Sequence, residues 1–453
     1  MLGQKAALPR PSVRSRFPDA KSRSSNLYER ALKSLPGGNS RHTVFFPPYP
    51  IYAVRGSGSR IWDADGSERI DFINNYSALI HGHNHPRIVE AIIRQAETLL
   101  AVSLPTEKEI ALAELIAGRL PTVEQVRFCN SGTEAVLYAI KAARAFTGRA
   151  KIAKVEGAYH GSAETASVGV TPPPSLFGPA DTPSSVPGSG NTMGIAGDVV
   201  VLPMNDVENG RRILRAHAAD LAGIIVDPLV KNLGFLPASR AFLQMLREEA
   251  DANGALLIYD EVYSMRLGFH GAQGAVGVLP DLTAMGKIIG GGLPVGAVGG
   301  PERIMAALFD PRQGARLAHG GTFNANPMTM AAGLAALEML DQAAFDRLSR
   351  LGDRLRAGLR EALRIANVPG AVRGAASMVQ LWHTDRDIET YRDLVAARGE
   401  NVDVQKRAET VFRYFLNNGM LIGAPGFFVL STAITEDEVD FAIETALQAL
   451  RTL

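Results

Sequence analysis

The sequence predicts an α/β fold with a parallel β-sheet and a division into two domains, and one observation supports each part of this prediction. First, from Leu104 onward, short apolar runs rich in β-branched residues alternate with longer stretches of helical character. Such alternation is typical of βαβ units, in which helices cover both faces of a parallel sheet. Second, a chain of 453 residues with 46% hydrophobic residues can bury a large core, which favours two domains.

The predicted elements follow one another along the middle of the chain. Strands are expected in the runs QVRFCN, KIAKVEG, VVVLPMN, AGIIVDPLV, ALLIYDEV and LTAM, with a helix in TEAVLYAIKAARAF. The segment from Pro172 to Asp198 is rich in proline, glycine and serine, which predicts a long surface loop of the kind that often forms a lid. A long helical run then leads into a C-terminal region that reads as a smaller α+β domain.

The charge balance excludes a general attraction for nucleic acid or for an anionic membrane, because 47 basic residues face 46 acidic ones. No apolar run is long enough to predict a membrane span, and no secretory signal is apparent, so we expect a cytoplasmic protein. Residues 1–23 are basic and serine-containing, which leaves an organelle transit peptide as the alternative to a disordered tail. The single cysteine, Cys129, excludes an internal disulfide and a multi-cysteine zinc site.

Several predicted strands end in polar side chains, at the edge of the sheet where ligands bind. After the first strand, Ser131, Gly132 and Thr133 stand where the chain turns into a helix. Free backbone N–H groups and the positive end of the helix dipole make this position suitable for a phosphate. A serine that merely caps the helix would give the same pattern.

Two further strand ends add an aromatic residue and a carboxylate. Tyr159 and His160 follow the second strand, where the tyrosine can stack on a flat ligand or simply fill the core. Asp260 follows the apolar run ALLIY, and burying its carboxylate without a cationic partner would be costly. A protonated heterocyclic nitrogen is one such partner.

Lys287 follows the predicted strand LTAM and precedes a run of glycines. Apolar surroundings disfavour its ammonium, so they lower the pKa and favour a nucleophilic amine that can form a Schiff base. A surface lysine beside a loop is the simpler alternative. A nucleotide P-loop is excluded, because Asp281 and Ile288 stand where that motif needs a glycine and a hydroxyl.

A phosphate site, a stacking aromatic ring, a buried carboxylate and a lysine are together the groups that bind pyridoxal 5'-phosphate. From about Leu35 to the C-terminus the sequence resembles the fold-type I, class III aminotransferases, and among them the glutamate-1-semialdehyde aminomutases and the β-amino acid (β-phenylalanine-type) aminotransferases. The motifs that carry the resemblance are LPGGNSR, GHNHP, NSGTEA, YHG, DEV, PDLTAMGKIIGGGLPVGAVGG and GGTFNANPMTMAAG.

The resemblance implies a role for each candidate site residue. Lys287 would form the Schiff base and later shuttle the proton, and Asp260 would pair with the pyridine nitrogen. The remaining cofactor contacts would be Ser131, Gly132 and Thr133 on the phosphate, Tyr159, His160 and Val262 around the ring, Asn205 and Asp227 nearby, and Thr322 on the phosphate of the neighbouring subunit. The last contact implies a homodimer with shared active sites.

The resemblance also implies the architecture. A large domain with a mostly parallel seven-stranded sheet would bind the cofactor, and a smaller α+β domain would be formed by both chain termini. The implied boundaries are a disordered basic tail (1–26), an N-terminal segment of the small domain (27–80), the large domain (81–327) and the C-terminal small domain (328–453). The run WDADGSERIDF is expected to form a hairpin, since Asp-Gly fits a tight turn.

The substrate anchors match the family unevenly. Arg41 matches a carboxylate-binding arginine of the β-amino acid aminotransferases, with a surface arginine as the alternative interpretation. Tyr76 matches an aromatic residue of the substrate pocket. Pro425 stands where the β-phenylalanine-type enzymes have a second arginine. Asp227 replaces a usual glutamate and Lys231 replaces a small residue, while Arg266 could serve substrate, interface or a structural ion pair.

The predicted activity is a ping-pong transfer of an amino group from a β-amino acid or related amine to a 2-oxo acid. The segment LFDPRQGARLAHGGTFNANPMTMAAG favours this activity, while the loop TPSSVPGSGNT resembles the aminomutases and keeps a glutamate-1-semialdehyde 2,1-aminomutase as the alternative. A remote alternative is a metal-dependent hydrolase that uses His81, His83 and His85, which alternate as zinc ligands on one strand would.

Overall fold

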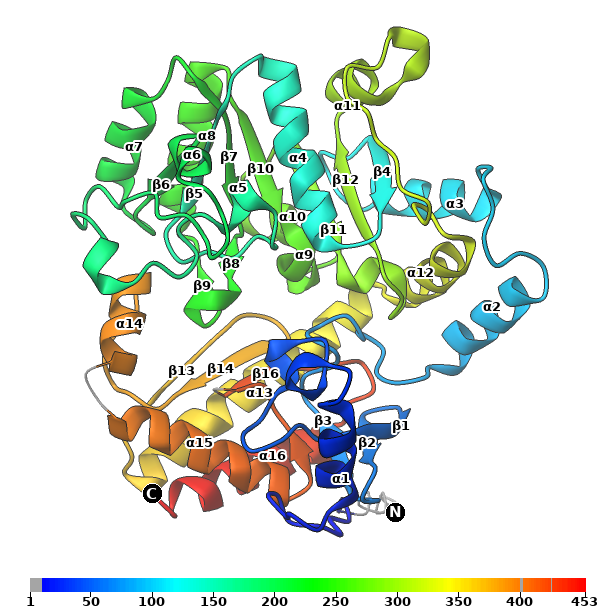
Figure 1. Cartoon of the computed structure of the whole chain (residues 1–453), viewed down its shortest axis with the longest axis vertical. Helices are drawn as coiled ribbons and strands as arrows, with labels where there is room; N and C mark the ends of the chain where they lie inside the picture. Colours follow the sequence, from blue (N-terminus) through cyan, green and yellow to red (C-terminus); the bar gives the residue numbers. More distant parts are fainter. Residues whose placement is uncertain (1–9, 400–401, 425) are drawn as a thin grey trace, which may run out of the picture.

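A computed structural model describes residues 10–399, 402–424 and 426–453 of the chain. The chain folds into two bodies (Figure 1). The large body is a sheet with helices on both faces, and the smaller body below it contains both described chain ends. No helix of the described residues is long and apolar enough to cross a membrane.

A seven-stranded sheet forms the centre of the large body (Figure 1), as predicted. Its strands lie in the order β4 (Gln125–Cys129), β12 (Gly296–Gly300), β11 (Leu282–Gly286), β10 (Leu256–Asp260), β7 (Leu221–Val226), β5 (Lys151–Val155) and β6 (Val199–Leu202). Only β12 runs antiparallel to its neighbours. Six of the seven strands coincide with the predicted apolar runs, and the glycine-rich β12 is the one that the sequence did not predict.

Alternate strand residues enter cores on opposite faces of this sheet. On β7, Ile224 and Val226 pack with α8 (Arg240–Asn253) and α7 (Val207–Ala216), whereas Ile225 packs with α4 (Gly132–Thr147). Burial on both faces explains why the strands read as continuous apolar runs. The other helices of this body are α2 (Pro86–Ala96), α3 (Glu107–Ala117), α5 (Glu164–Ser167), α6 (Met193–Gly197), α9 (Glu261–Ser264), α10 (Gly271–Val276), α11 (Glu302–Phe309) and α12 (Pro327–Met339).

The smaller body joins the two ends of the chain. Strands β1 (Ala53–Ser57), β2 (Arg60–Asp63) and β3 (Glu68–Asp71) form an antiparallel meander, and β15 (Met420–Leu421) adds to β3 in parallel. The β2–β3 pair is the predicted hairpin. The rest of this body comprises β13 (Ala371–Arg373), β14 (Met378–Trp382), β16 (Phe427–Val429), α1 (Arg23–Ala31), α13 (Gln342–Ala366), α14 (Tyr391–Gly399), α15 (Val402–Asn417) and α16 (Glu436–Leu450).

The described part of the basic tail differs from the disordered segment expected over residues 1–26. Phe17 is buried in the main core, and its backbone N–H donates to Asn417 Oδ1 at 2.6 Å. Ser22 caps α1 by accepting a hydrogen bond from the Ser25 N–H. An aromatic anchor and a helix cap thus give residues 10–26 contacts that their charge pattern did not predict. Residues 1–9 lie outside the described part.

The segment from Pro172 to Asp198 is largely irregular, as predicted, with only short helical turns in it. The small body holds this loop through α14, because Arg392 pairs with Glu156 at 3.0 Å and donates to the carbonyl oxygens of Phe177, Gly178 and Pro179. The loop therefore bridges the two bodies.

Candidate active site

Most of the predicted site residues meet in a cavity of about 390 Å³ at the carboxyl ends of the large sheet. The strands and helix starts bring them together because parallel strands present their carboxyl ends at one edge. The cavity is lined by Arg41, Ser131, Gly132, Thr133, Tyr159, His160, Asp227, Asp260, Val262 and Lys287 among the predicted residues. Three predicted residues are absent from this lining: Tyr76, Asn205 and Thr322.

Lys287 follows β11 directly and begins a short 3-10 turn with a φ of 50°, in the left-handed region. Its Nζ lies 3.8 Å from the ring centroid of Tyr263, a contact that favours a cation over the ring face. Burial nevertheless lowers the pKa of Lys287 to about 8, although the charges of Asp260 and Asp227 act in the opposite direction. A neutral, nucleophilic amine is therefore accessible near neutral pH.

Asp260 is the last residue of β10 and is buried. One carboxylate oxygen accepts the Val262 N–H at 3.0 Å, and the other lies 2.8 Å from His160 Nδ1. Burial lowers the pKa of His160, so the imidazole is neutral and its Nδ1–H donates to the carboxylate. The histidine thereby fixes the orientation of Asp260, and its Nε2 has no partner among the described residues.

The start of α4 is the position at which the sequence predicts a phosphate site. Ser131 caps the helix by accepting the Glu134 N–H at 3.2 Å, and Gly132 and Thr133 are its first two residues. Their backbone N–H groups have no acceptor within the helix and point out of its positive end. A Cβ added to Gly132 would lie 2.9 Å from Val262, so only glycine allows this close approach.

Asp227 follows β7, and its Oδ1 accepts the Leu229 N–H at 3.0 Å. Burial, followed by the charge of Asp260, raises its pKa well above the usual range. Tyr159 also lines the cavity, but half of its side chain is exposed (52%), which leaves a ring face free to cover a flat ligand.

Arg41 is exposed, and its Nη1 donates to Asn75 Oδ1 at 3.0 Å. Residues 74–77 all have positive φ values, a left-handed turn that the two asparagines favour. Tyr76 lies in this turn but outside the cavity lining. Its hydroxyl donates to the Thr43 carbonyl oxygen, and its ring centroid lies 5.7 Å from that of Phe427.

The other two residues outside the cavity lining have different surroundings. Asn205 donates to the Pro237 carbonyl oxygen and accepts the Ser239 N–H at 2.8 Å, which are structural contacts before α8. Thr322 is exposed in the turn that precedes α12.

Arg266 forms no ion pair with the residues that the structure describes, although a structural ion pair was one of the expected alternatives. It is buried and donates to oxygens of Ser77, Ser377 and Leu430, so it links the left-handed turn to the small body. Pro425, the other position singled out by the resemblance, lies outside the described residues.

Sequence analysis missed Tyr263 and Asn75, which also line the cavity. Tyr263 lies three residues after Asp260, so its position within the DEVY run could have placed it beside the carboxylate. Asn75 could have been found from the paired asparagines, which are typical of left-handed turns.

Two of the three histidines of the alternative metal site have separate polar partners, and Nδ1 of the third, His85, has no hydrogen-bond partner among the described residues. His81 contacts Thr432 and the Ala336 carbonyl oxygen, each at 2.9 Å, while His83 pairs with Asp71 at 2.8 Å. Within the described ranges, no group of three or more potential metal ligands is present. The structure therefore gives no support to a metal-dependent hydrolase.

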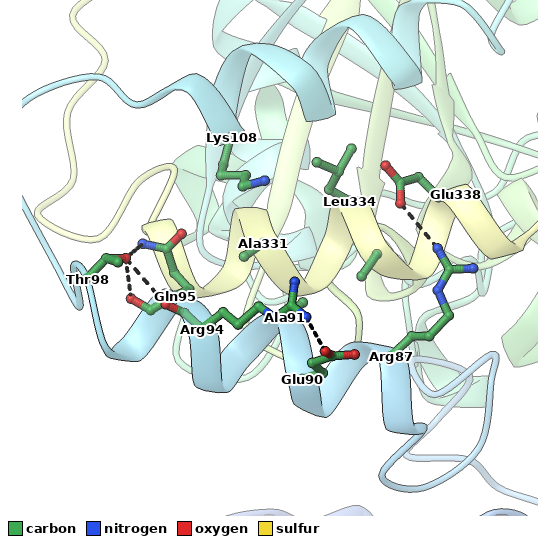
Figure 2. A pocket seen from close by; sticks show the side chains of 11 residues that line it. Arg87, Glu90, Ala91, Arg94, Gln95, Thr98, Lys108, Ala331, Leu334 and Glu338 are labelled. Carbon is green, nitrogen blue, oxygen red and sulfur yellow. Dashed lines mark hydrogen bonds and ion pairs between the residues drawn. The ribbon is translucent and has the colours of Figure 1, made fainter.

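Another hollow, of about 380 Å³, lies between α2 and α12, away from these groups. Figure 2 shows that charged side chains from the two helices line it, including the ion pair between Arg87 and Glu338 at 3.5 Å. None of the predicted site residues lies there.

The fold and the cavity define an enzyme of fold type I that uses pyridoxal phosphate. The class III aminotransferase family model matches residues 44–450, and the chain belongs to this family. It is a pyridoxal-phosphate-dependent transaminase.

Individual relatives agree with this assignment. The chain is 39% identical to the β-phenylalanine transaminase of Variovorax paradoxus, over 94% of this chain and 92% of that protein. It is 37% identical to a glutamate-1-semialdehyde 2,1-aminomutase of Halalkalibacterium halodurans, over 95% and 98%. Among solved structures, an ω-transaminase from Sphaerobacter thermophilus is 47% identical and superposes with a TM-score of 0.92, over 96% of this chain and 98% of that one.

Proposed function

We propose that this protein transfers the amino group of a β-amino acid or a related amine to a 2-oxo acid by a ping-pong mechanism. The observation that carries the proposal is that one cavity holds a lysine suited to Schiff-base chemistry, a buried carboxylate and the guanidinium of Arg41. A guanidinium binds a carboxylate through two parallel hydrogen bonds. The transaminase of Variovorax paradoxus supports the same class of donor.

The residues fit the cofactor. The N–H groups of Gly132 and Thr133 with the Ser131 and Thr133 hydroxyls would hold the phosphate, Tyr159 would cover one ring face and Val262 the other. Asp260, oriented by His160, would hold a proton on the pyridine nitrogen. When bound, the cofactor supplies an electron sink for the substrate carbon.

The protein's own groups would then handle the proton and the substrate. The Lys287 amine, with a pKa of about 8, can accept a proton from the substrate carbon and return one to it. Asp227 would add a hydrogen bond beside the ring, and Arg41 would fix the carboxylate at the exposed end of the cavity. Asn205 and Tyr76, which lie outside the lining, would support neighbouring segments.

A homodimer with shared active sites belongs to the same proposal. Large apolar side chains are exposed on and between α2 and α3, namely Ile93, Leu100, Leu104 and Ile110, and Phe323 is exposed beside Thr322. Exposed apolar clusters often mark protein interfaces. Thr322 would reach the phosphate bound by the partner subunit.

The aminomutase remains a second candidate, since the relative from Halalkalibacterium halodurans carries that name. An aminomutase converts its substrate without any added acceptor. We therefore expect β-phenylalanine to be consumed only when a 2-oxo acid such as pyruvate is present, with formation of alanine. Consumption of glutamate-1-semialdehyde without an acceptor, and no reaction of β-phenylalanine, would favour the aminomutase.

Arg41→Ala tests the donor site. Loss of the charged hydrogen bonds should raise KM for β-phenylalanine about 10- to 100-fold, while kcat for an amine without a carboxylate stays the same. Arg41→Lys is the matched control, because it keeps the charge but not the two parallel N–H donors. Its KM for β-phenylalanine should lie between those of the wild type and Arg41→Ala. Equal KM values for the wild type and Arg41→Ala would remove Arg41 from the donor site.

A further inference from the structure

Lys231 is a second cation in the cavity that contains Lys287. It follows β8 (Leu229–Val230) and begins a 3-10 turn, and its Nζ lies 5.0 Å from the ring centroid of Phe427. Within the described part of the chain, no carboxylate lies within ion-pair distance of this ammonium. Its contact with the protein is therefore a cation–π contact, which leaves the N–H donors of the ammonium available.

This placement is unfavourable in the absence of an anion. Burial lowers the pKa of Lys231, and the charge of Arg398 on α14 lowers it further. The charge of Lys231 in turn contributes to lowering the pKa of Lys287, because the two ammonium groups repel each other. Burial raises the pKa of Asp227, and no carboxylate is among the groups that shift the pKa of Lys231. An anionic ligand would relieve this imbalance.

The cavity thus contains two further cations, Lys231 and Arg41, in different surroundings. Lys231 is partly buried and close enough to affect Lys287, whereas Arg41 is exposed and is held by Asn75. The two substrates of the proposed reaction differ in where they carry the carboxylate. The carboxylate of a 2-oxo acid is attached to the reacting carbon, whereas that of a β-amino acid lies one carbon further away.

We propose that Lys231 binds the carboxylate of the 2-oxo acid acceptor, whereas Arg41 binds the more distant carboxylate of the donor. This assignment rests on the proposed function and names the residue that selects the acceptor. The same cavity can then bind the donor carboxylate and the acceptor carboxylate at different positions, without one cationic side chain having to move between them.

The acceptor half-reaction can be measured by itself, on protein loaded with pyridoxamine 5'-phosphate. Lys231→Met removes the charge but keeps a long apolar side chain. We expect kcat/KM for pyruvate to fall about 10- to 100-fold, as for loss of a charged hydrogen bond, and kcat/KM for propanal, which has no carboxylate, to change less than about twofold. Lys231→Arg should restore most of the activity with pyruvate.

Two controls separate binding from indirect effects. Lys33→Met makes the same substitution at an exposed lysine outside the cavity and should behave as the wild type. Titration of the loaded protein with propanoate, a carboxylate that cannot react, should show binding at least about tenfold weaker in Lys231→Met.

A loss of equal size with pyruvate and propanal would overturn the proposal, because it would mean that Lys231 acts through Phe427 or through the pKa of Lys287. Unchanged propanoate binding would overturn it as well. Failure of the proposed donor is a separate result: the wild type would not accept an amino group from β-phenylalanine, yet the loaded protein would still react with pyruvate.

Discussion

At the residue scale, the chemistry of the cavity follows from where three strands end. Lys287 follows β11, Asp260 ends β10, and Asp227 follows β7. The local sequence pattern predicted Lys287 and Asp260, because a charged side chain directly after a buried apolar run is costly without a function, whereas Asp227 was expected only from the family resemblance. It did not predict that His160 would orient Asp260, since residues 100 positions apart meet only in the folded sheet.

The lowered pKa of Lys287 predicts how cofactor uptake depends on pH. A lysine with an ordinary pKa near 10.5 is almost fully charged at pH 8, whereas one with a pKa of about 8 is half neutral. Only the neutral amine attacks an aldehyde. The rate at which the apoprotein gains the visible absorption of bound cofactor should therefore rise through about pH 8 and level off above it. A rate that continues to rise toward pH 10 would contradict the lowered pKa.

At the element scale, β12 shows what the sequence could not predict. Only one residue of GAVGG, Val298, is β-branched, and its three glycines are not typical of a strand. The structure explains them by close packing, since a Cβ on Gly296 would lie 2.0 Å from the Ser131 carbonyl oxygen and one on Gly299 would lie 2.7 Å from Val123. β12 must pass directly beside the turn that begins α4.

Gly296→Ala tests this packing. The added methyl group must displace the backbone at Ser131, so we expect the free energy of unfolding to fall by about 1–3 kcal/mol and cofactor affinity to fall with it. Gly197→Ala is the matched control, because a Cβ at this position meets no atom within 4 Å. Denaturant unfolding of both variants checks the prediction. Equal stability of the two variants would contradict the close approach of β12.

At the scale of the whole molecule, the sequence predicted the large sheet and the joining of both termini better than the details of the site. Strands buried on both faces are visible in the sequence as continuous apolar runs. The pairing of β3 with β15 joins segments far apart in the chain, so no local pattern in the sequence predicts it. The family resemblance predicted that both termini form the smaller domain, but it did not predict this pairing. Residues 10–26, the described part of the basic tail, are ordered where disorder was expected, because Phe17 is buried in the core despite the charged composition around it.

The proposed dimer leads to a prediction at this scale. Ile110→Asp places a charge among the exposed apolar side chains of α2 and α3, and it should convert the dimer to monomers. Because Thr322 would no longer reach a partner's phosphate, the affinity for cofactor should fall at the same time. Sedimentation and cofactor titration measure both effects. A dimer that persists with full cofactor affinity would place the interface elsewhere.

The most direct test of the central claim is the absorption spectrum of the purified, cofactor-loaded protein before and after addition of a racemic β-amino acid, with Lys287→Ala as the control. We predict a visible band for the wild type that gives way to near-ultraviolet absorption when the amino group is transferred, and no such change for Lys287→Ala. A visible band that the β-amino acid leaves unchanged would contradict the proposed donor. A wild type without the band, even after cofactor is added, would contradict the role of Lys287 itself.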